Sequence, residues 1–312
     1  MSGRRVLTLR RREARTGLAL ISPTLVITLV VVVLPLLWAV MFAFQHARLI
    51  NIRYTGLFGR YTLENFSYVL GEPGFWSGLA VTLVYTVAGT FLSIAVGLVA
   101  ALALNTRFRG RTLVRASILL PYVAPVVAAT FVWQVMLSPQ YGIANEIGTR
   151  LLGWDRPVGF LTQASGELLG VNVPVALLTV IAFEAWRYFP FAFLFLLARL
   201  QAVPRELHEA ALVDGATPVQ RFRYVTLPQL GRVIALLAVL RFVFTFNKFD
   251  DVYLLTGGGA GTEVVSIRVF NLLTARDDIG ASAAQAVVLA LVLVGFLGLY
   301  LRFFAEPERS TE

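Results

Sequence analysis

The amino-acid sequence predicts an all-α integral membrane protein with about six transmembrane helices and both termini in the cytoplasm. Of its 312 residues, 57% are hydrophobic and only 14% are charged, whereas a soluble domain carries charges on about a quarter of its residues. Six apolar runs each reach the length of about 20 residues that a helix needs to cross a bilayer. Backbone groups in lipid must be satisfied within the segment, so helices are expected rather than open strands. The runs cover residues 18–44, 79–104, 113–137, 173–198, 233–255 and 281–304.

The distribution of basic residues predicts the orientation of these helices. With the N-terminus placed in the cytoplasm, 17 of the 27 basic residues fall in cytoplasmic segments and eight in outer loops. This asymmetry is typical of the positive-inside rule. It also accounts for the net charge of +9 without a nucleic-acid partner. The two remaining basic residues, Arg187 and Arg241, lie within apolar runs.

The organisation expected is a single membrane domain with short cytoplasmic ends. Residues 1–17 would form a basic cytoplasmic N-terminus, residues 18–304 the transmembrane domain, and residues 305–312 a cytoplasmic tail. The first apolar run is about twice the length of a signal-peptide core, so we expect a retained helix. A twin-arginine export signal at Arg11-Arg12 is the alternative interpretation.

Residue types that carry metal or nucleotide chemistry are scarce. The chain has no cysteine and two histidines, which are too few and too far apart to suggest a metal site. A glycine run at 257–261 lacks the following Gly-Lys-Ser/Thr of a phosphate-binding loop. We therefore expect no catalytic residues, no ATPase motif, no metal and no cofactor in this chain.

The connection between the fourth and fifth runs, Ala202–Leu230, predicts two short helices joined by a tight turn. Pro204 suits the first position of a helix, and Gly215 suits a left-handed helix end. Thr217 with Gln220 fits a capping box that begins the second helix, which Pro228 is expected to stop. Such a loop either packs on its own subunit or docks on a cytoplasmic partner.

Three motifs make the sequence resemble a known transporter family. Glu209-Ala210-Ala211, Gly215 and Val225–Pro228 are similar to the EAA signature of permease subunits in binding-protein-dependent ABC importers. Leu255–Gly259 and Asp278–Ala283 resemble stretches of the carbohydrate-uptake branch of that family. Two positions depart from that pattern: Ala260 and Arg232 stand where proline is usual.

The resemblance implies a transport subunit that forms half of a translocation path for a sugar or sugar-like solute. Loop 199–231 would couple it to two cytoplasmic ATPase subunits, which use ATP and Mg²⁺. The other implied partners are a related second permease subunit and an extracytoplasmic solute-binding protein, in the cytoplasmic membrane of a bacterium. The implied ATPase-coupling residues are Glu209, Ala210, Ala211, Asp214 and Gly215.

Charged residues within the apolar runs are functional candidates, because charges in lipid are expensive. Glu184 and Arg187, three residues apart, share a helix face, and Arg241 lies at a similar depth. We expect Glu184 to neutralise one or both arginines near the translocation path. The cluster either braces the helices or contacts the solute. A secondary transporter driven by an ion gradient, with Glu184 or Asp251 as proton site, is the alternative function.

A second polar group is expected near the outer end of the fifth helix. Asn247, Asp250 and Asp251 are predicted to share one face there, with Tyr253 close by. Carboxylates, amides and aromatic rings suit a polyhydroxylated ligand. A solvated helix end is the alternative interpretation.

Overall fold

The computed structural model describes residues 3–56, 59–106, 108–168 and 171–304. The predicted cytoplasmic tail 305–312 lies outside this range, as does Arg107. Apart from one short β-hairpin, the described regular structure is helical. Within these ranges, five helices are long and apolar enough to cross a membrane, or six if one bent pair counts as a span. The predicted fold class is therefore confirmed.

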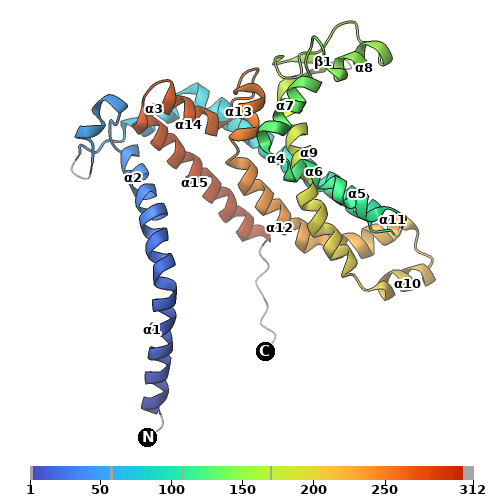
Figure 1. The fold of residues 1–312 in the computed structure, drawn as a ribbon, viewed down its shortest axis with the longest axis horizontal. Helices are drawn as coiled ribbons and strands as arrows, with labels where there is room; N and C mark the ends of the chain where they lie inside the picture. Colours follow the sequence, from blue (N-terminus) through green and yellow to red (C-terminus); the bar gives the residue numbers. More distant parts are fainter. Residues whose placement is uncertain (1–2, 57–58, 107, 169–170, 305–312) are drawn as a thin grey trace. The chain divides into compact units, whose positions relative to one another are not determined.

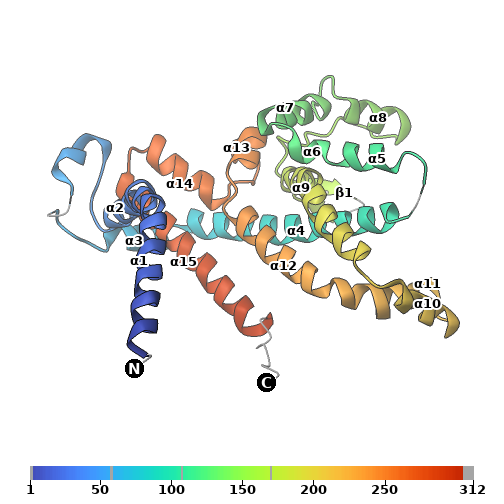
Figure 2. The same cartoon turned by 60° about the horizontal axis from the view of Figure 1, so that its bottom comes forward.

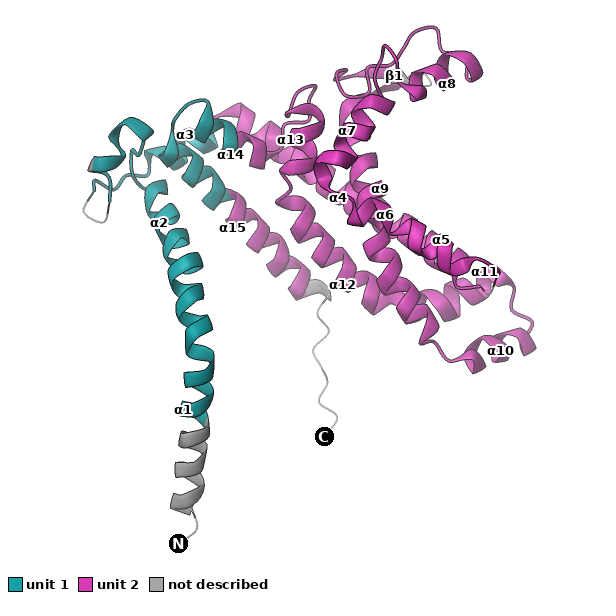
Figure 3. Cartoon of the chain, in the orientation of Figure 1, with its two compact units in different colours: residues 1–71, 269–288 teal, residues 72–268, 289–312 magenta. Residues whose placement is uncertain are grey.

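The chain divides into two compact units (Figure 3). The first comprises residues 1–71 and 269–288, and the second residues 72–268 and 289–312. The first candidate span of the chain, Ala14–Ala43, belongs to the first unit. It is built from α1 (Gly3–Thr28), a π-helical turn η1 (Leu29–Val33) and α2 (Leu34–Ala43). The most apolar stretch of this span is not buried within the described chain, as expected of a helix that faces lipid.

The rest of the first unit is held together by local polar contacts. A 3-10 helix η2 (Leu49–Tyr54) and α3 (Glu64–Gly71) follow the first span. The buried Asn65 amide on α3 donates to the backbone oxygens of Ala43 and Gln45, at 3.0 and 2.8 Å. The bond to Ala43 provides a partner for the last carbonyl of α2, and the bond to Gln45 ties α3 to the chain that follows.

Three long helices form the centre of the second unit (Figure 1). These are α4 (Pro73–Leu104), α9 (Val175–Gln201) and α12 (Leu227–Phe246), which pack against one another. Small residues permit the close approach of α4 and α9. A Cβ atom at Gly97 would lie 2.7 Å from the Ala192 Cβ and 2.9 Å from the Phe189 carbonyl oxygen, so only glycine fits there.

The third predicted run, 113–137, is a broken span. It consists of α5 (Arg111–Ile118), α6 (Leu120–Val123) and α7 (Val126–Met136), and the axis turns by 96° between Val123 and Val126. Ala124 adopts an extended conformation with ψ 140°. The cause is Pro125, because a residue before proline is pushed out of the α region.

The outer connection differs from one expectation. The sequence of the long outer loop 138–172 also allows a short helix at Gln163–Leu169, but within its described part Gly166–Leu168 forms β1, antiparallel to β2 (Val171–Val173). The short helix of this region is α8 (Ile143–Leu151) instead. Gly166 disfavours a helix, and the β-branched valines of β2 favour a strand.

The fifth predicted run, 233–255, is displaced toward the N-terminus. The spanning helix extends over Pro218–Phe246, and Asp250–Thr256 forms a separate helix, α13. Asn247, Lys248 and Phe249 separate the two helices, and the backbone of Phe249 is non-helical (φ −125°, ψ −56°). The last elements are α14 (Val265–Thr274) and α15 (Ile279–Phe304).

The glycine-rich turn after α13 has an unusual backbone at Ala260, with φ +53°. Gly257, Gly258 and Gly261 also have positive φ. A proline ring fixes φ near −65°. A proline at position 260, where the family pattern has one, would therefore require a different backbone in this turn.

Candidate functional site

The predicted two-helix loop is present at one end of the second unit, remote from α13 (Figures 1 and 2). Its first helix is α10 (Arg205–Val213), with Pro204 at the N-cap rather than at the first helical position. The helix ends as predicted at Gly215, whose φ is +76°. The Gly215 N–H donates to the Leu212 carbonyl oxygen at 3.0 Å, and the Ala216 N–H to that of Ala211 at 2.9 Å. This pair of bonds is a Schellman motif.

The second helix begins with the predicted capping box. The Thr217 N–H donates to Gln220 Oε1 at 2.8 Å, and the Gln220 N–H donates to Thr217 Oγ1 at 3.3 Å. The two reciprocal bonds fix the start of α11 (Pro218–Arg221) immediately after the glycine turn.

The expectation that Pro228 stops this helix is wrong. A π-helical turn η3 (Phe222–Thr226) joins α11 directly to α12, so the helix runs on into the span. The Leu227 N–H bonds to the Phe222 carbonyl oxygen, five residues back. The wider turn accommodates the ring and missing N–H of Pro228, which would disrupt an ordinary α-helix. The same arrangement precedes Leu34-Pro35 in the first span.

The five predicted coupling residues lie on an accessible loop. Glu209, Ala210, Asp214 and Gly215 are exposed, and Ala211 is half-buried. The sequence reasoning did not single out Val213, whose side chain is 89% exposed beside the glycine turn. A hydrophobic residue so exposed at the end of a rigidly capped helix indicates a surface that a partner could cover.

The predicted partnership between Glu184 and Arg241 is present. Both side chains are buried, and the Arg241 guanidinium forms an ion pair and hydrogen bond with Glu184 Oε1. Thr245 Oγ1 also donates to Oε1, at 2.9 Å, while the Tyr85 hydroxyl donates to Oε2 at 2.9 Å. Glu184 thus connects α4, α9 and α12 and engages both of its oxygens.

Two features of this contact could not be read from the sequence. Tyr85 and Thr245 are ordinary helix residues in the sequence, and only the packing of three helices brings them to Glu184. Gly89 supplies the space: a Cβ atom there would lie 2.9 Å from the Glu184 Cγ. The small residue on α4 therefore allows the carboxylate to approach the helix.

Arg187 does not pair with Glu184, although the two lie on one helix. It lies 4.0 Å from Asp251 Oδ1 and donates to two backbone oxygens, of Pro121 at 3.4 Å and Ala124 at 3.0 Å. These carbonyls belong to the break between α6 and α7, where helical partners are missing. Arg187 therefore stabilises the bend of the third span.

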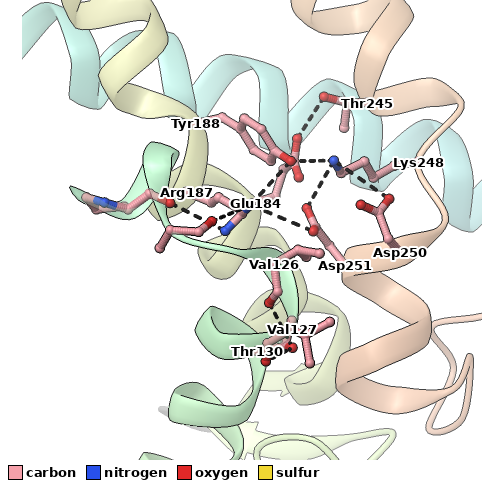
Figure 4. A network of polar contacts seen from close by, with 12 residues as sticks. Val126, Val127, Thr130, Glu184, Arg187, Tyr188, Thr245, Lys248, Asp250 and Asp251 are labelled. Atoms are coloured by element: carbon pink, nitrogen blue, oxygen red, sulfur yellow. Dashed lines mark hydrogen bonds and ion pairs between the residues drawn. The ribbon is translucent and has the colours of Figure 1, made fainter. Parts of the chain in front are cut away.

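Lys248 and Tyr188 form the more open edge of the same network (Figure 4). The Lys248 ammonium donates to the Tyr188 hydroxyl and lies 3.4 Å from Asp251 Oδ2 and 3.8 Å from Asp250 Oδ1. The Lys248 side chain is 15% exposed and that of Asp250 51%. Arg241 and Lys248 also lie over the Tyr188 ring, at 4.2 and 4.5 Å from its centre, within the range of a cation–π contact.

The predicted common face of Asn247, Asp250 and Asp251 is wrong. Asn247 caps the end of α12, whereas the two aspartates and Tyr253 belong to α13. Asp251 is fully buried, while Asn247, Asp250 and Tyr253 are exposed. The helix break at 247–249 rotates the later residues away from the face that a continuous helix would give them.

Comparisons with known proteins place these elements in a family. Residues 93–309 match the family described as the inner membrane component of binding-protein-dependent transport systems. That range contains both the two-helix loop and most of the Glu184 network. The match covers more than half of the chain.

Individual relatives agree with the family match. The chain is 36% identical over 233 residues to the inner membrane ABC transporter permease protein YcjO of Escherichia coli, covering 74% of this chain and 75% of YcjO. It is 33% identical over 296 residues to the trehalose/maltose transport system permease protein MalF of Thermococcus litoralis, covering 94% and 95% of the two chains.

A solved structure shares the fold. A chain of a bacterial ABC transporter that imports the acidic polysaccharide alginate superposes with a TM-score of 0.76 at 23% identity, over 96% of this chain and 99% of that one. A second structure of an alginate transporter, in complex with a periplasmic protein that carries an alginate pentasaccharide, gives the same TM-score at 22% identity, over 93% of this chain and 94% of that one. By the family match and its relatives, this chain is a membrane-embedded permease subunit of the binding-protein-dependent ABC transport systems.

Proposed function

We propose that the chain forms half of the translocation path of an ATP-driven importer for a sugar or sugar-like solute. Its partners would be a related second permease, two cytoplasmic ATPase subunits that use ATP and Mg²⁺, and an extracytoplasmic solute-binding protein. The relative named for trehalose and maltose, which aligns over nearly the whole chain, supports the solute class. The name of the YcjO relative and the arginine distribution support the inner membrane of a bacterium, with cytoplasmic termini.

The observation that carries the coupling role is the shape of the α10–α11 loop. The Schellman motif and the capping box hold two short helices at a fixed angle around Gly215. No other part of the described chain lies within 4 Å of a Cβ atom built at Gly215. The surface is therefore rigid and open, as a coupling helix that enters a cleft of an ATPase must be.

A pair of glycine variants tests this role. Gly215→Trp should leave membrane insertion intact and abolish capture of the ATPase subunits. Gly110→Trp is the matched control, because Gly110 has a similar φ of +86° and equally open surroundings in another predicted cytoplasmic connection. Both variants carry the same backbone strain, so a difference between them reports the surface at Gly215. ATPase co-purification and ATP-dependent uptake in proteoliposomes provide the two readouts.

The Glu184 network divides into a brace and a candidate solute contact. Both oxygens of Glu184 accept hydrogen bonds, from Arg241 and Thr245 on one side and from Tyr85 on the other, which supports a bracing role between three helices. The edge formed by Tyr188, Lys248 and Asp250 is more accessible. Hydroxyl-rich solutes need donors and acceptors, and Lys248 and Asp250 offer both at this edge.

An ion-coupled secondary transporter is the competing function. It would use Glu184 or Asp251 as a proton site and would need no ATPase. Uptake that proceeds with an ion gradient and without ATPase subunits would contradict the importer. The solute itself is best found by identifying the ligand of the cognate binding protein.

A further inference from the structure

A basic cavity of about 630 Å³ lies where α4 and α9 end and α5 and α10 begin. Its basic side chains are Arg111 and Arg115 of α5 and Arg205 and His208 of α10, and the buried Leu200 and Val203 form part of its lining. We call it the basic cavity. None of the described residues that line it carries a carboxylate.

The arginines of the basic cavity lack anionic partners. None of the carboxylates in the described part of the chain lies within ion-pair distance of Arg111, Arg115 or Arg205. Arg115 donates one N–H to the Leu104 carbonyl oxygen at the end of α4, at 2.5 Å. Its Nε atom is buried and has no hydrogen-bond partner. Three cations that converge without a counter-charge favour an anionic ligand.

The position of the basic cavity indicates where that anion comes from. The candidate spans Pro73–Leu104 and Val175–Gln201 both end at the cavity, so we expect it at the depth of the lipid headgroups. The proposed cytoplasmic orientation places it in the leaflet that carries anionic lipid. Basic pockets between transmembrane helices on that side bind phosphate headgroups, and the apolar Leu200 and Val203 suit the glycerol and upper acyl region.

We propose that the basic cavity binds the phosphate of an anionic phospholipid. This inference rests on the cytoplasmic placement of the coupling loop in the proposed function. Arg205 and His208 belong to α10, and Arg111 and Arg115 to α5, so one phosphate would join the coupling helix to the membrane end of the bent span. The lipid would thereby hold α10 in place while it transmits force.

The test compares two double variants of the full-length permease. Arg111→Gln with Arg205→Gln removes two cavity cations and spares Arg115, which caps α4. Arg109→Gln with Arg223→Gln removes the same charge from two exposed arginines in neighbouring cytoplasmic segments outside the cavity. Each protein is reconstituted in phosphatidylcholine vesicles with and without phosphatidylglycerol, and retained phosphatidylglycerol is measured by native mass spectrometry after extraction.

The cavity variant should retain roughly thirtyfold less phosphatidylglycerol than wild type, as expected from losing two basic side chains near an anionic surface, and the control should match wild type. Equal losses of phosphatidylglycerol from both variants would mean that the lipid is attracted to the basic surface in general, and would overturn the proposal of a specific site. Inorganic phosphate that displaces the lipid completely at millimolar concentration would assign the cavity to a free anion instead.

A separate readout keeps this inference distinct from the coupling role. ATPase capture is measured on the same variants in phosphatidylcholine alone. Loss of ATPase capture with unchanged lipid retention would assign the cavity to the ATPase and overturn the lipid proposal. Lipid retention needs no ATPase, so it remains measurable even where coupling through Gly215 is disproved.

Discussion

The Tyr85 hydroxyl donates a 2.9 Å hydrogen bond to Glu184 Oε2, although 99 residues separate the two in the chain. Both side chains are buried, and the bond joins α4 to α9 at the carboxylate that also holds Arg241. The hydrogen bonds to both carboxylate oxygens offset the free-energy cost of burying this charge. Removing any one partner destabilises the fold, because it leaves a buried charged group unpaired.

Removing either charge of the Glu184–Arg241 pair should destabilise the permease strongly. Glu184→Gln leaves Arg241 as an uncompensated buried cation, at a cost of about 3–5 kcal/mol. Arg241→Gln likewise leaves the Glu184 carboxylate as a buried anion without its cationic partner. The double variant should lose less than the sum of the two, by about 0.5–3 kcal/mol. Thermal unfolding of the purified protein in detergent measures the cycle, and strictly additive losses would contradict direct pairing.

The hydroxyl of Tyr85 alone should be worth a measurable fraction of that stability. Tyr85→Phe keeps the ring and leaves Glu184 Oε2 without a donor, which costs about 1–3 kcal/mol. Tyr141→Phe, on an exposed ring, is the matched control and should change nothing measurable. The same unfolding assay compares the two, and equal stabilities would show that the Tyr85 bond contributes nothing.

The turn after α13 should become more stable when Ala260 is replaced by glycine. Ala260 has φ +53°, and an L-residue in the left-handed region carries about 1–2 kcal/mol of strain. Ala260→Gly relieves it. Ala116→Gly, at an exposed position inside α5, should have the opposite sign and cost about 1 kcal/mol. A fall in stability for Ala260→Gly would show that this backbone conformation is not strained.

The absence of cysteine makes the predicted orientation directly testable. A cysteine introduced at Val213, which is 89% exposed, should react with a membrane-impermeant maleimide only after cells are permeabilised. A cysteine at Ile50, 92% exposed in a predicted outer loop, should react in spheroplasts with intact membranes. The reverse pattern would place the α10–α11 loop outside and remove the basis of coupling.

The sequence by itself determined the helical membrane class and the approximate span positions, because hydrophobic runs of fixed length are a local property. It likewise determined the turn at Gly215 and the capping box at Thr217, whose bonds join residues within one or two helical turns. The pairing of Glu184 with Arg241 was predicted correctly, because the rise per residue of a helix gives the depth of each side chain in the membrane from its position along the span.

Only the tertiary structure decided how the polar residues combine. Arg187 is drawn to the carbonyls exposed by the break at Ala124, and Tyr85, Thr245 and Tyr188 join the network through packing between helices. Asp251 separates from Asn247 because the chain breaks at 247–249. These outcomes depend on contacts between residues distant in sequence and on the positions at which helices are interrupted. Local periodicity specifies neither.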